Sequence, residues 1–161
     1  MRRTSFKGAN CSVAGTLEIV GEWWSLLVVR AAFLGLERFE ELQERLGIAR
    51  NVLAVRLRTL VANGVLERHR YQERPPRYEY HLTEKGRALF PVIVSLMTWG
   101  DAWVAKSGPP LLFVDRATGA PIEPVLVDRR TGRAVEPGAV RGVPGPGASE
   151  RTRRQMLARG E

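Results

Sequence analysis

The sequence predicts an α+β fold that is mainly helical: a winged helix-turn-helix, then a long C-terminal dimerisation helix and a short extension rich in β-hairpins. Three observations support this prediction. Two segments with helical periodicity flank a Gly-containing turn at residues 47–49, an alternating segment with an Arg-rich turn follows them, and a long apolar segment comes next. A helix-turn-helix that carries a β-hairpin, or wing, is typical of proteins that bind duplex DNA.

The N-terminal part predicts an arm and two helices. Residues 1–10 are basic and lack periodicity, so we expect a flexible basic arm. From Cys11 the pattern becomes helical, with apolar residues at i, i+4 and i+7 until Gly21 interrupts it. Residues 22–34 are apolar on nearly every side, which predicts a central buried helix that a partner chain could share.

Two short helices and a hairpin are predicted next. The first helix covers residues 39–46, and the second covers 50–63 with Gly64 at its C-terminal end. The second helix has an apolar inner face, formed by Leu53, Leu57, Leu60 and Val61. From residue 65 to 72 the period becomes two, residues 74–77 turn the chain, and residues 78–82 form the return strand.

A long helix is predicted from residue 84 to 106, with Thr83 as its N-cap and a kink at Pro91. Its apolar positions exceed what one small domain needs to cover, which favours a dimer interface. Burial in the core of a monomer is the alternative. The winged helix-turn-helix domain is therefore expected to span residues 11–106.

An internal repeat follows the long helix. Residues 114–124 (VDRATGAPIEP) recur thirteen residues later as 127–137 (VDRRTGRAVEP), and each Thr-Gly pair is a turn signal. Residues 107–137 are therefore expected to form two small hairpins that depend on the rest of the chain for stability. Residues 138–161 are expected to form a disordered basic tail.

The charge distribution indicates a polyanionic partner. The 161 residues carry a formal net charge of +8, with a pI near 10.7. Seven arginines and two acids lie between residues 50 and 77, a local net charge of +5 on the second short helix and the wing. A solvated surface that touches no partner is the alternative.

Composition also excludes several classes of protein. A single Cys excludes a disulfide framework and a Cys-rich zinc site. The longest apolar runs fall well short of the ~18 residues of a membrane span, and the N-terminus carries no signal-peptide pattern. We expect a cytoplasmic, nucleoid-associated protein without a membrane partner.

In a winged helix-turn-helix the second helix enters the major groove. Arg50 and Asn51 are candidates for contacts with guanine and adenine, and Ala54 or Val55 for contact with a thymine methyl group. The other candidates are expected to contact phosphates or the minor groove; they are Arg56, Arg58, Arg70, Arg74 and Arg77. For each arginine the alternative is an exposed side chain that contacts nothing.

Several motifs in order resemble the HxlR-type bacterial transcriptional regulators, over about residues 10–105. They are Cys11-Ser12-Val13-Ala14, Glu22-Trp23-Trp24-Ser25-Leu26-Leu27, Arg38-Phe39-Glu40-Glu41-Leu42, residues 53–68, Tyr80-His81-Leu82-Thr83-Glu84-Lys85-Gly86 and Trp99-Gly100. The resemblance implies a DNA-binding homodimer, here expected to repress from an inverted repeat. Ala49 stands where such proteins often have a capping Ser. The tail lacks the Cys residues of some long, zinc-ribbon-like relatives, so no metal is expected there.

Two kinds of switch are considered. Cys11 lies at a helix start, and in some proteins of the resembled family a Cys at this position senses oxidants; a small packing residue is the alternative. Six side chains are candidates for a small-molecule pocket, with plain core packing as the alternative: Trp23, Trp24, Phe33, Met97, Trp99 and Trp103.

Enzyme activity is not expected. The sequence has no Gly-rich phosphate loop, HExxH or GxSxG motif, and no cofactor is implied. His69 and His81 could face each other across the hairpin, but two His without carboxylate support make a weak metal site. The main rival to DNA binding is a winged-helix interaction module whose basic face binds an acidic protein.

Overall fold

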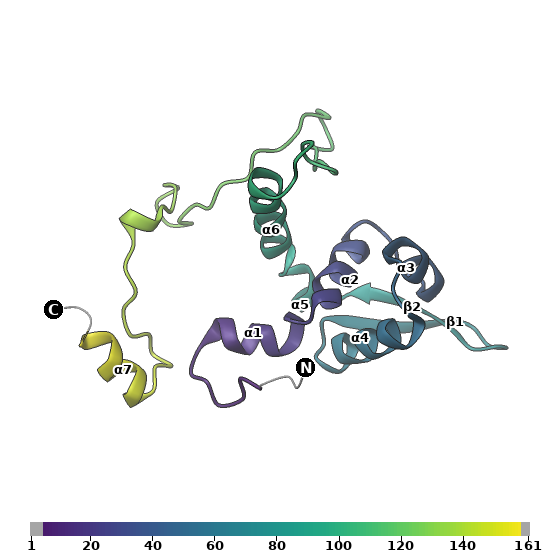
Figure 1. The fold of residues 1–161 in the computed structure, drawn as a ribbon, viewed down its shortest axis with the longest axis horizontal. Coiled ribbons are helices and arrows are strands. Elements are labelled where there is room, and N and C mark those ends of the chain that lie inside the picture. The colour runs from purple at the N-terminus through teal and green to yellow at the C-terminus, as the bar shows by residue number, and fades with distance from the viewer. Residues whose placement is uncertain (1–4, 159–161) are drawn as a thin grey trace. The chain divides into compact units, whose positions relative to one another are not determined.

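A computed structural model describes residues 5–158 of the chain. The chain divides between Met97 and Thr98 into two compact units, which are described separately. The first unit holds the helix-turn-helix and the hairpin, and the second holds the C-terminal extension (Figure 1). The first unit confirms the predicted α+β winged-helix fold. The boundaries expected at residues 10, 106 and 137 stay predictions.

Helices α1 (Ser12–Val20) and α2 (Trp23–Phe33) open the first unit. Gly21 lies between them because a Cβ there would collide with the Leu17 carbonyl oxygen. Helix α2 buries one side, including Val28 and Val29, whereas Trp23 at its start is 88% exposed. Residues 5–9, part of the expected arm, lie against α1, where Ser5 Oγ donates to Glu18 at 3.2 Å. Residues 1–4 lie outside the described part.

The helix-turn-helix consists of α3 (Phe39–Leu46) and α4 (Arg50–Ala62). Gly47 ends α3 with φ of 61°, a left-handed conformation that glycine adopts at low cost. The predicted inner face of α4 is confirmed, since Leu53, Leu57 and Leu60 are at most 1% exposed. These side chains pack with Leu42 and α2 in the core, which fixes the opposite face of α4 toward solvent.

The hairpin consists of β1 (Leu66–Gln72) and β2 (Arg77–Leu82), paired antiparallel with an irregularity between Arg70 and Gln72. Figure 1 shows its tip projecting beyond α3 and α4. The segment before α3 joins its edge, because Tyr80 N–H donates to the Glu37 carbonyl at 2.8 Å. The base of the wing is thus attached to the start of the helix-turn-helix.

The single helix predicted for residues 84–106 is wrong. The structure has α5 (Glu84–Arg87), a break, and α6 (Phe90–Trp103). Pro91 explains the break, because its ring would clash with the carbonyl of Arg87 four residues earlier if the helix continued. The predicted cap is confirmed, since Gly86 N–H donates to Thr83 Oγ1 at 3.1 Å.

In the second unit each repeat folds into a small hairpin, as predicted. One bridge joins Val114 to Pro121 and another joins Val127 to Ala134. Gly119 and Gly132, the Gly of each Thr-Gly turn, have φ of 72° and 68°. Asp115 and Asp128 hold the turns by accepting hydrogen bonds from backbone N–H groups two residues later.

The expectation that residues 138–161 lack regular structure is wrong for part of the segment. A 3₁₀ turn covers Pro137–Ala139, and helix α7 covers Glu150–Leu157. Ser149 caps α7 by accepting a hydrogen bond from Thr152 N–H at 3.2 Å, and Glu150 pairs with Arg154 at 3.0 Å. Local capping and charge pairing therefore stabilise a helix that buries none of its residues. Residues 159–161 lie outside the described part.

No single helix in the described range 5–158 is long and apolar enough to cross a membrane. The bent pair α1 and α2 passes that test together, by length and composition only.

Candidate nucleic-acid interface

The N-terminal turn of α4 presents two of the predicted contact residues. Arg50 and Asn51 are both exposed. The Arg50 guanidinium lies 4.9 Å from the ring centre of Phe39, a cation–π contact that holds it beside the start of α3. The Ala49 side chain cannot cap the helix, and Asn51 Oδ1 instead accepts a hydrogen bond from Val52 N–H at 2.9 Å. The positive end of the α4 dipole and a guanidinium therefore lie together at this turn.

Further along α4 the predicted contact residues divide into two groups. Val55 is 39% exposed, Ala54 is half-buried, and Arg58 is exposed with its Nε donating to the Ala54 carbonyl at 3.3 Å. Arg56 differs, because its side chain is only 18% exposed and its Nη1 lies 3.7 Å from Glu22 Oε2.

The expected phosphate role of Arg56 is therefore corrected. Residue 56 follows Leu53 by three positions and precedes Leu60 by four, so it shares their inner side of the helix. There it pairs with Glu22, the residue before α2. Arg56 is left out of the interface proposed below.

The wing tip carries the remaining predicted arginines. Arg74 and Arg77 are exposed. Arg70 is engaged within the turn, where Nη2 lies 2.9 Å from Glu73 Oε2 and also donates to the Glu73 carbonyl at 2.9 Å. The tip thus offers two arginines with exposed side chains and a third that holds the turn together.

A hollow of about 170 Å³ joins the start of α4 to the wing. It contains one acid and two cationic side chains, Arg50 and Arg77. Its full lining is Phe39, Glu40, Arg50, Pro76, Arg77, Tyr78 and Tyr80. Two predicted contact residues from different elements therefore border the same concave surface.

The aromatic part of this hollow was not predicted. Tyr78 and Tyr80 come from alternate positions of β2, and the Arg68 guanidinium lies 4.1 Å from the Tyr78 ring centre. Burial raises the pKa of Tyr80, which keeps its phenol neutral. The pairing of the two strands indicates this aromatic group, because Arg68 opposes Tyr80 and Arg70 opposes Tyr78 on one face of the hairpin.

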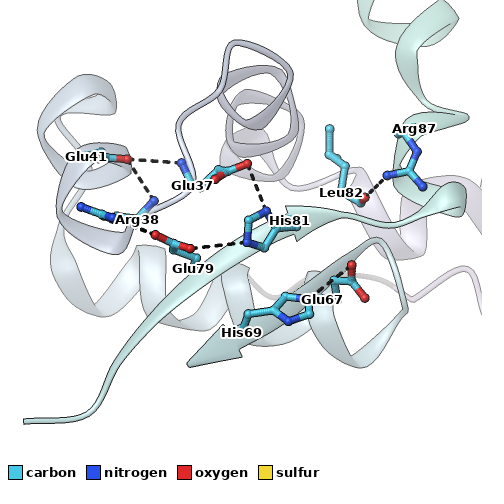
Figure 2. Close-up of polar contacts among 9 residues, drawn as sticks. All are labelled: Glu37, Arg38, Glu41, Glu67, His69, Glu79, His81, Leu82 and Arg87. Atoms are coloured by element: carbon cyan, nitrogen blue, oxygen red, sulfur yellow. Dashed lines mark hydrogen bonds and ion pairs between the residues drawn. The ribbon is translucent and has the colours of Figure 1, made fainter. Parts of the chain in front are cut away.

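The other face of the hairpin carries a polar cluster (Figure 2). His81 Nδ1 lies 3.0 Å from Glu37 Oε1, and His81 Nε2 lies 3.7 Å from Glu79 Oε2. Arg38 binds the other oxygen of Glu79 through Nε and Nη2, both at 2.9 Å, and this bond raises the pKa of Arg38.

His69 and His81 do face each other, with ring centres 5.1 Å apart. The inference that they lack carboxylate support is wrong. Glu37, Glu67 and Glu79 lie beside them, because residues 67, 69, 79 and 81 share one face of the hairpin and residue 37 lies at its edge. Glu67 and Glu79 each lie two residues before a histidine, so the alternation along the strands indicates that they share a face with it. Glu37 is distant in sequence from both strands, so no local pattern indicates its position.

The candidate switch residues occupy different surroundings. Cys11 is exposed, unpaired with another Cys, and forms the N-cap of α1. Trp24, Phe33 and Met97 are packed against the core of the first unit. Trp23, Trp99 and Trp103 are 88%, 61% and 77% exposed. A separate hollow of about 110 Å³ is lined by other residues, Thr16, Ile19, Val20, Val65, Lys85 and Leu89. A pocket formed by the six predicted side chains stays a prediction.

Comparison with known proteins places this geometry in a family. The model of the HxlR-like helix-turn-helix family matches residues 19–108, which hold the helix-turn-helix, the wing and α6. The chain belongs to the HxlR-like helix-turn-helix family. It is a transcriptional regulator with a helix-turn-helix DNA-binding domain, and the family is not an enzyme family.

Two similar proteins match this chain beyond the winged helix. The uncharacterized HTH-type transcriptional regulator Rv3095 of Mycobacterium tuberculosis is 44% identical over 137 residues, which are 84% of this chain and 87% of that protein. The solved structure of PA1607, a candidate transcription factor, is 41% identical with a TM-score of 0.78, covering 86% of this chain and 98% of that one. The sequence match to the first protein and the structural match to the second therefore both cover more of this chain than residues 19–108.

A third comparison concerns regulation. The redox regulator HypR in its reduced form is 33% identical with a TM-score of 0.54, covering 57% of this chain and 92% of that chain.

Proposed function

We propose that this HxlR-like protein is a homodimer that binds an inverted-repeat operator and represses transcription there. The observation that supports this most is the shared hollow, in which Arg50 of α4 and Arg77 of the wing border one surface. In a winged helix these two elements follow the major groove and the adjoining backbone. A dimer bound to an operator that overlaps a promoter blocks that promoter, and this is enough for repression.

Each interface residue has a distinct proposed role. Arg50 and Asn51 contact base edges, because they are exposed in the first turn of α4. Ala54 and Val55 touch a thymine methyl group. The remaining side chains bind phosphates or the minor groove; they are Arg58, Arg70, Arg74 and Arg77.

The proposed dimer uses the exposed apolar side of α6. Val92, Leu96, Trp99 and Trp103 follow a helical i, i+4, i+7, i+11 spacing and are 41%, 50%, 61% and 77% exposed. Ile93 and Val94 of the same helix are buried. A stripe of large apolar side chains of this length is typical of an interface, and a second copy of the chain is the proposed occupant.

Titration of DNA at several salt concentrations tests the assignment. Arg50→Ala and Asn51→Ala are expected to weaken binding selectively at one operator position, whereas Arg74→Ala and Arg77→Ala weaken binding to all sequences and lower the salt dependence. Equal effects of all four variants on specific and random duplexes contradict the roles. Binding to an acidic protein but not to duplex DNA would favour the interaction-module alternative.

Oxidation of Cys11 is proposed as a switch. The exposure of its thiol and the structural similarity to the redox regulator HypR support this proposal. The chain has one Cys, so oxidation must produce an intersubunit disulfide, a mixed disulfide with a small thiol or an oxidised sulfur. Oxidant should release wild-type protein from DNA but not Cys11→Ser, and release of both contradicts the proposal.

A further inference from the structure

Arg38 lies where the first helix of the helix-turn-helix begins, and its side chain extends onto the wing. Its backbone N–H donates to Glu41 Oε2 at 3.1 Å, and this bond closes the first turn of α3. The guanidinium binds Glu79 of β2, with Nε and Nη2 both 2.9 Å from Oε1 (Figure 2). The same guanidinium lies 4.7 Å from the ring centre of Tyr71 in β1. One side chain therefore joins α3 to both strands of the wing.

The contact with Tyr71 falls on a bulge of the hairpin. Tyr71 is one extra residue in β1, because the residues before and after it pair with consecutive residues of β2. An extra residue bends a strand and increases its twist, so the direction of the hairpin beyond it depends on how the bulge is held. The tip arginines Arg74 and Arg77 both lie beyond this bulge. Arg38 therefore contacts the point that determines where the tip points.

The residues at the start of α3 contact both of the proposed DNA-binding elements. Arg38 forms an antiparallel bridge with Glu79, so the backbone and the side chain of Arg38 both hold the wing. The next residue, Phe39, has its ring centre 4.9 Å from the guanidinium of Arg50 in the first turn of α4. Two adjacent residues thus connect the wing and the start of α4 to one short segment.

The ion pair of Arg38 is too exposed to be a main source of stability. The side chains of Arg38 and Glu79 are 50% and 22% exposed. Exposed ion pairs contribute little to the free energy of unfolding, because water and salt screen them. The geometry is nevertheless specific to arginine, since a planar guanidinium can direct two N–H groups at a carboxylate while its flat face covers a ring, and a lysine ammonium cannot. These contacts therefore orient the wing more than they stabilise the fold.

We propose that Arg38 is a positioning residue for DNA binding, which holds the wing at its bulge so that the tip arginines reach the same DNA segment as α4. The proposal rests on the proposed function, in which Arg77 binds a phosphate. Arg38 acts through the wing, because Glu79 engages its Nε and Nη2 and Tyr71 covers its flat face. A wing released from Arg38 keeps its own arginines but loses their placement relative to α4.

Amide exchange measured by NMR on the full chain tests the restraint without DNA. Tyr80 N–H donates to the Glu37 carbonyl at 2.8 Å, where the wing joins the segment before α3. Arg38→Ala should speed exchange of the Tyr80 amide about tenfold through local opening, and should leave the amide of the buried Leu57 unchanged. Arg45→Ala, the matched control, removes an exposed arginine of α3 outside these contacts and should change neither amide. Equal Tyr80 exchange in wild type and Arg38→Ala overturns the proposal.

A double substitution tests the effect on DNA binding, with affinity for a duplex measured by fluorescence anisotropy at several salt concentrations. Arg38→Ala should lower the slope of log affinity against log salt at least as much as Arg77→Ala does, because the whole tip loses its phosphates. Adding Arg77→Ala to Arg38→Ala should then lower the slope less than half as much as Arg77→Ala does alone. An equal loss in both backgrounds means that Arg38 acts separately, as through a phosphate contact of its own, and overturns the proposal.

Two further variants separate orientation from charge and from folding. Arg38→Lys keeps the positive charge without the planar fork, so it should recover less than half of the lost slope, and full recovery contradicts the positioning role. Glu79→Gln removes the charged acceptor while Arg38 remains, and should shift the slope and the Tyr80 exchange in the same directions as Arg38→Ala. It tests the proposal independently if Arg38→Ala does not fold. If Arg77→Ala alone leaves the slope unchanged, the proposed phosphate contact fails, whereas faster Tyr80 exchange in Arg38→Ala still supports the restraint.

Discussion

Arg77→Ala probes the wing side of the proposed DNA surface. Arg77 is exposed at the first residue of β2 and borders the hollow that also contains Arg50. We expect the variant to lose one phosphate contact per chain and therefore two in the dimer. Each phosphate contact contributes about 0.9 to the slope of log affinity against log salt, so the slope should fall by about 1.8.

The effect is large enough to measure. A slope difference of about 1.8 makes the wild-type affinity fall about 12-fold more than that of the variant when salt increases fourfold. Fluorescence anisotropy with a labelled operator and a scrambled duplex, each at four or more salt concentrations, measures both slopes. Arg116→Ala, which removes an exposed arginine from the first hairpin of the second unit, is the matched control. An unchanged slope for Arg77→Ala, or a loss confined to the operator, refutes the phosphate role.

Three further substitutions test the dimer and the fold. Trp99→Asp places a charge in the apolar stripe of α6, so this variant should sediment as a monomer. The control Val125→Asp changes a 74% exposed residue outside the stripe and should stay dimeric. If both variants sediment as dimers, α6 does not form the interface. Thr83→Ala removes the hydrogen bond from Gly86 N–H and should lower the free energy of unfolding, measured in urea, by about 1 kcal/mol. An unchanged urea midpoint argues against a stabilising cap at Thr83. Leu57→Ala leaves a cavity at a 1% exposed position and should cost about 2–5 kcal/mol in the same assay, whereas a loss below about 1 kcal/mol contradicts its place in the core.

Local patterns predicted most of the first unit. Leu53, Leu57 and Leu60 repeat at helical spacing, and this spacing is enough to identify the buried face of α4. Gly64 has φ of 67°, which is the conformation expected just after a helix end. These features depend on neighbours within a few residues, so the sequence contains the information directly.

Interactions between distant segments could not be predicted in the same way. Arg56 was expected to face DNA because its charge suits phosphate, but its partner Glu22 lies beside another helix. Glu37 and His81 are 44 residues apart and meet only because residue 37 joins the edge of the hairpin. The division between α5 and α6 depended on how strongly Pro91 disrupts a helix, which periodicity does not indicate.

The proposed dimer of this HxlR-like regulator binds two half-sites through α4 and the wing. Hydroxyl-radical footprinting on an operator selected from random DNA measures how many half-sites the protein covers. Two protected half-sites related by inverted repetition are expected, with centres about 34 Å apart, or one helical turn. A single protected half-site, or protection that does not depend on Arg50, rules out this mode of binding.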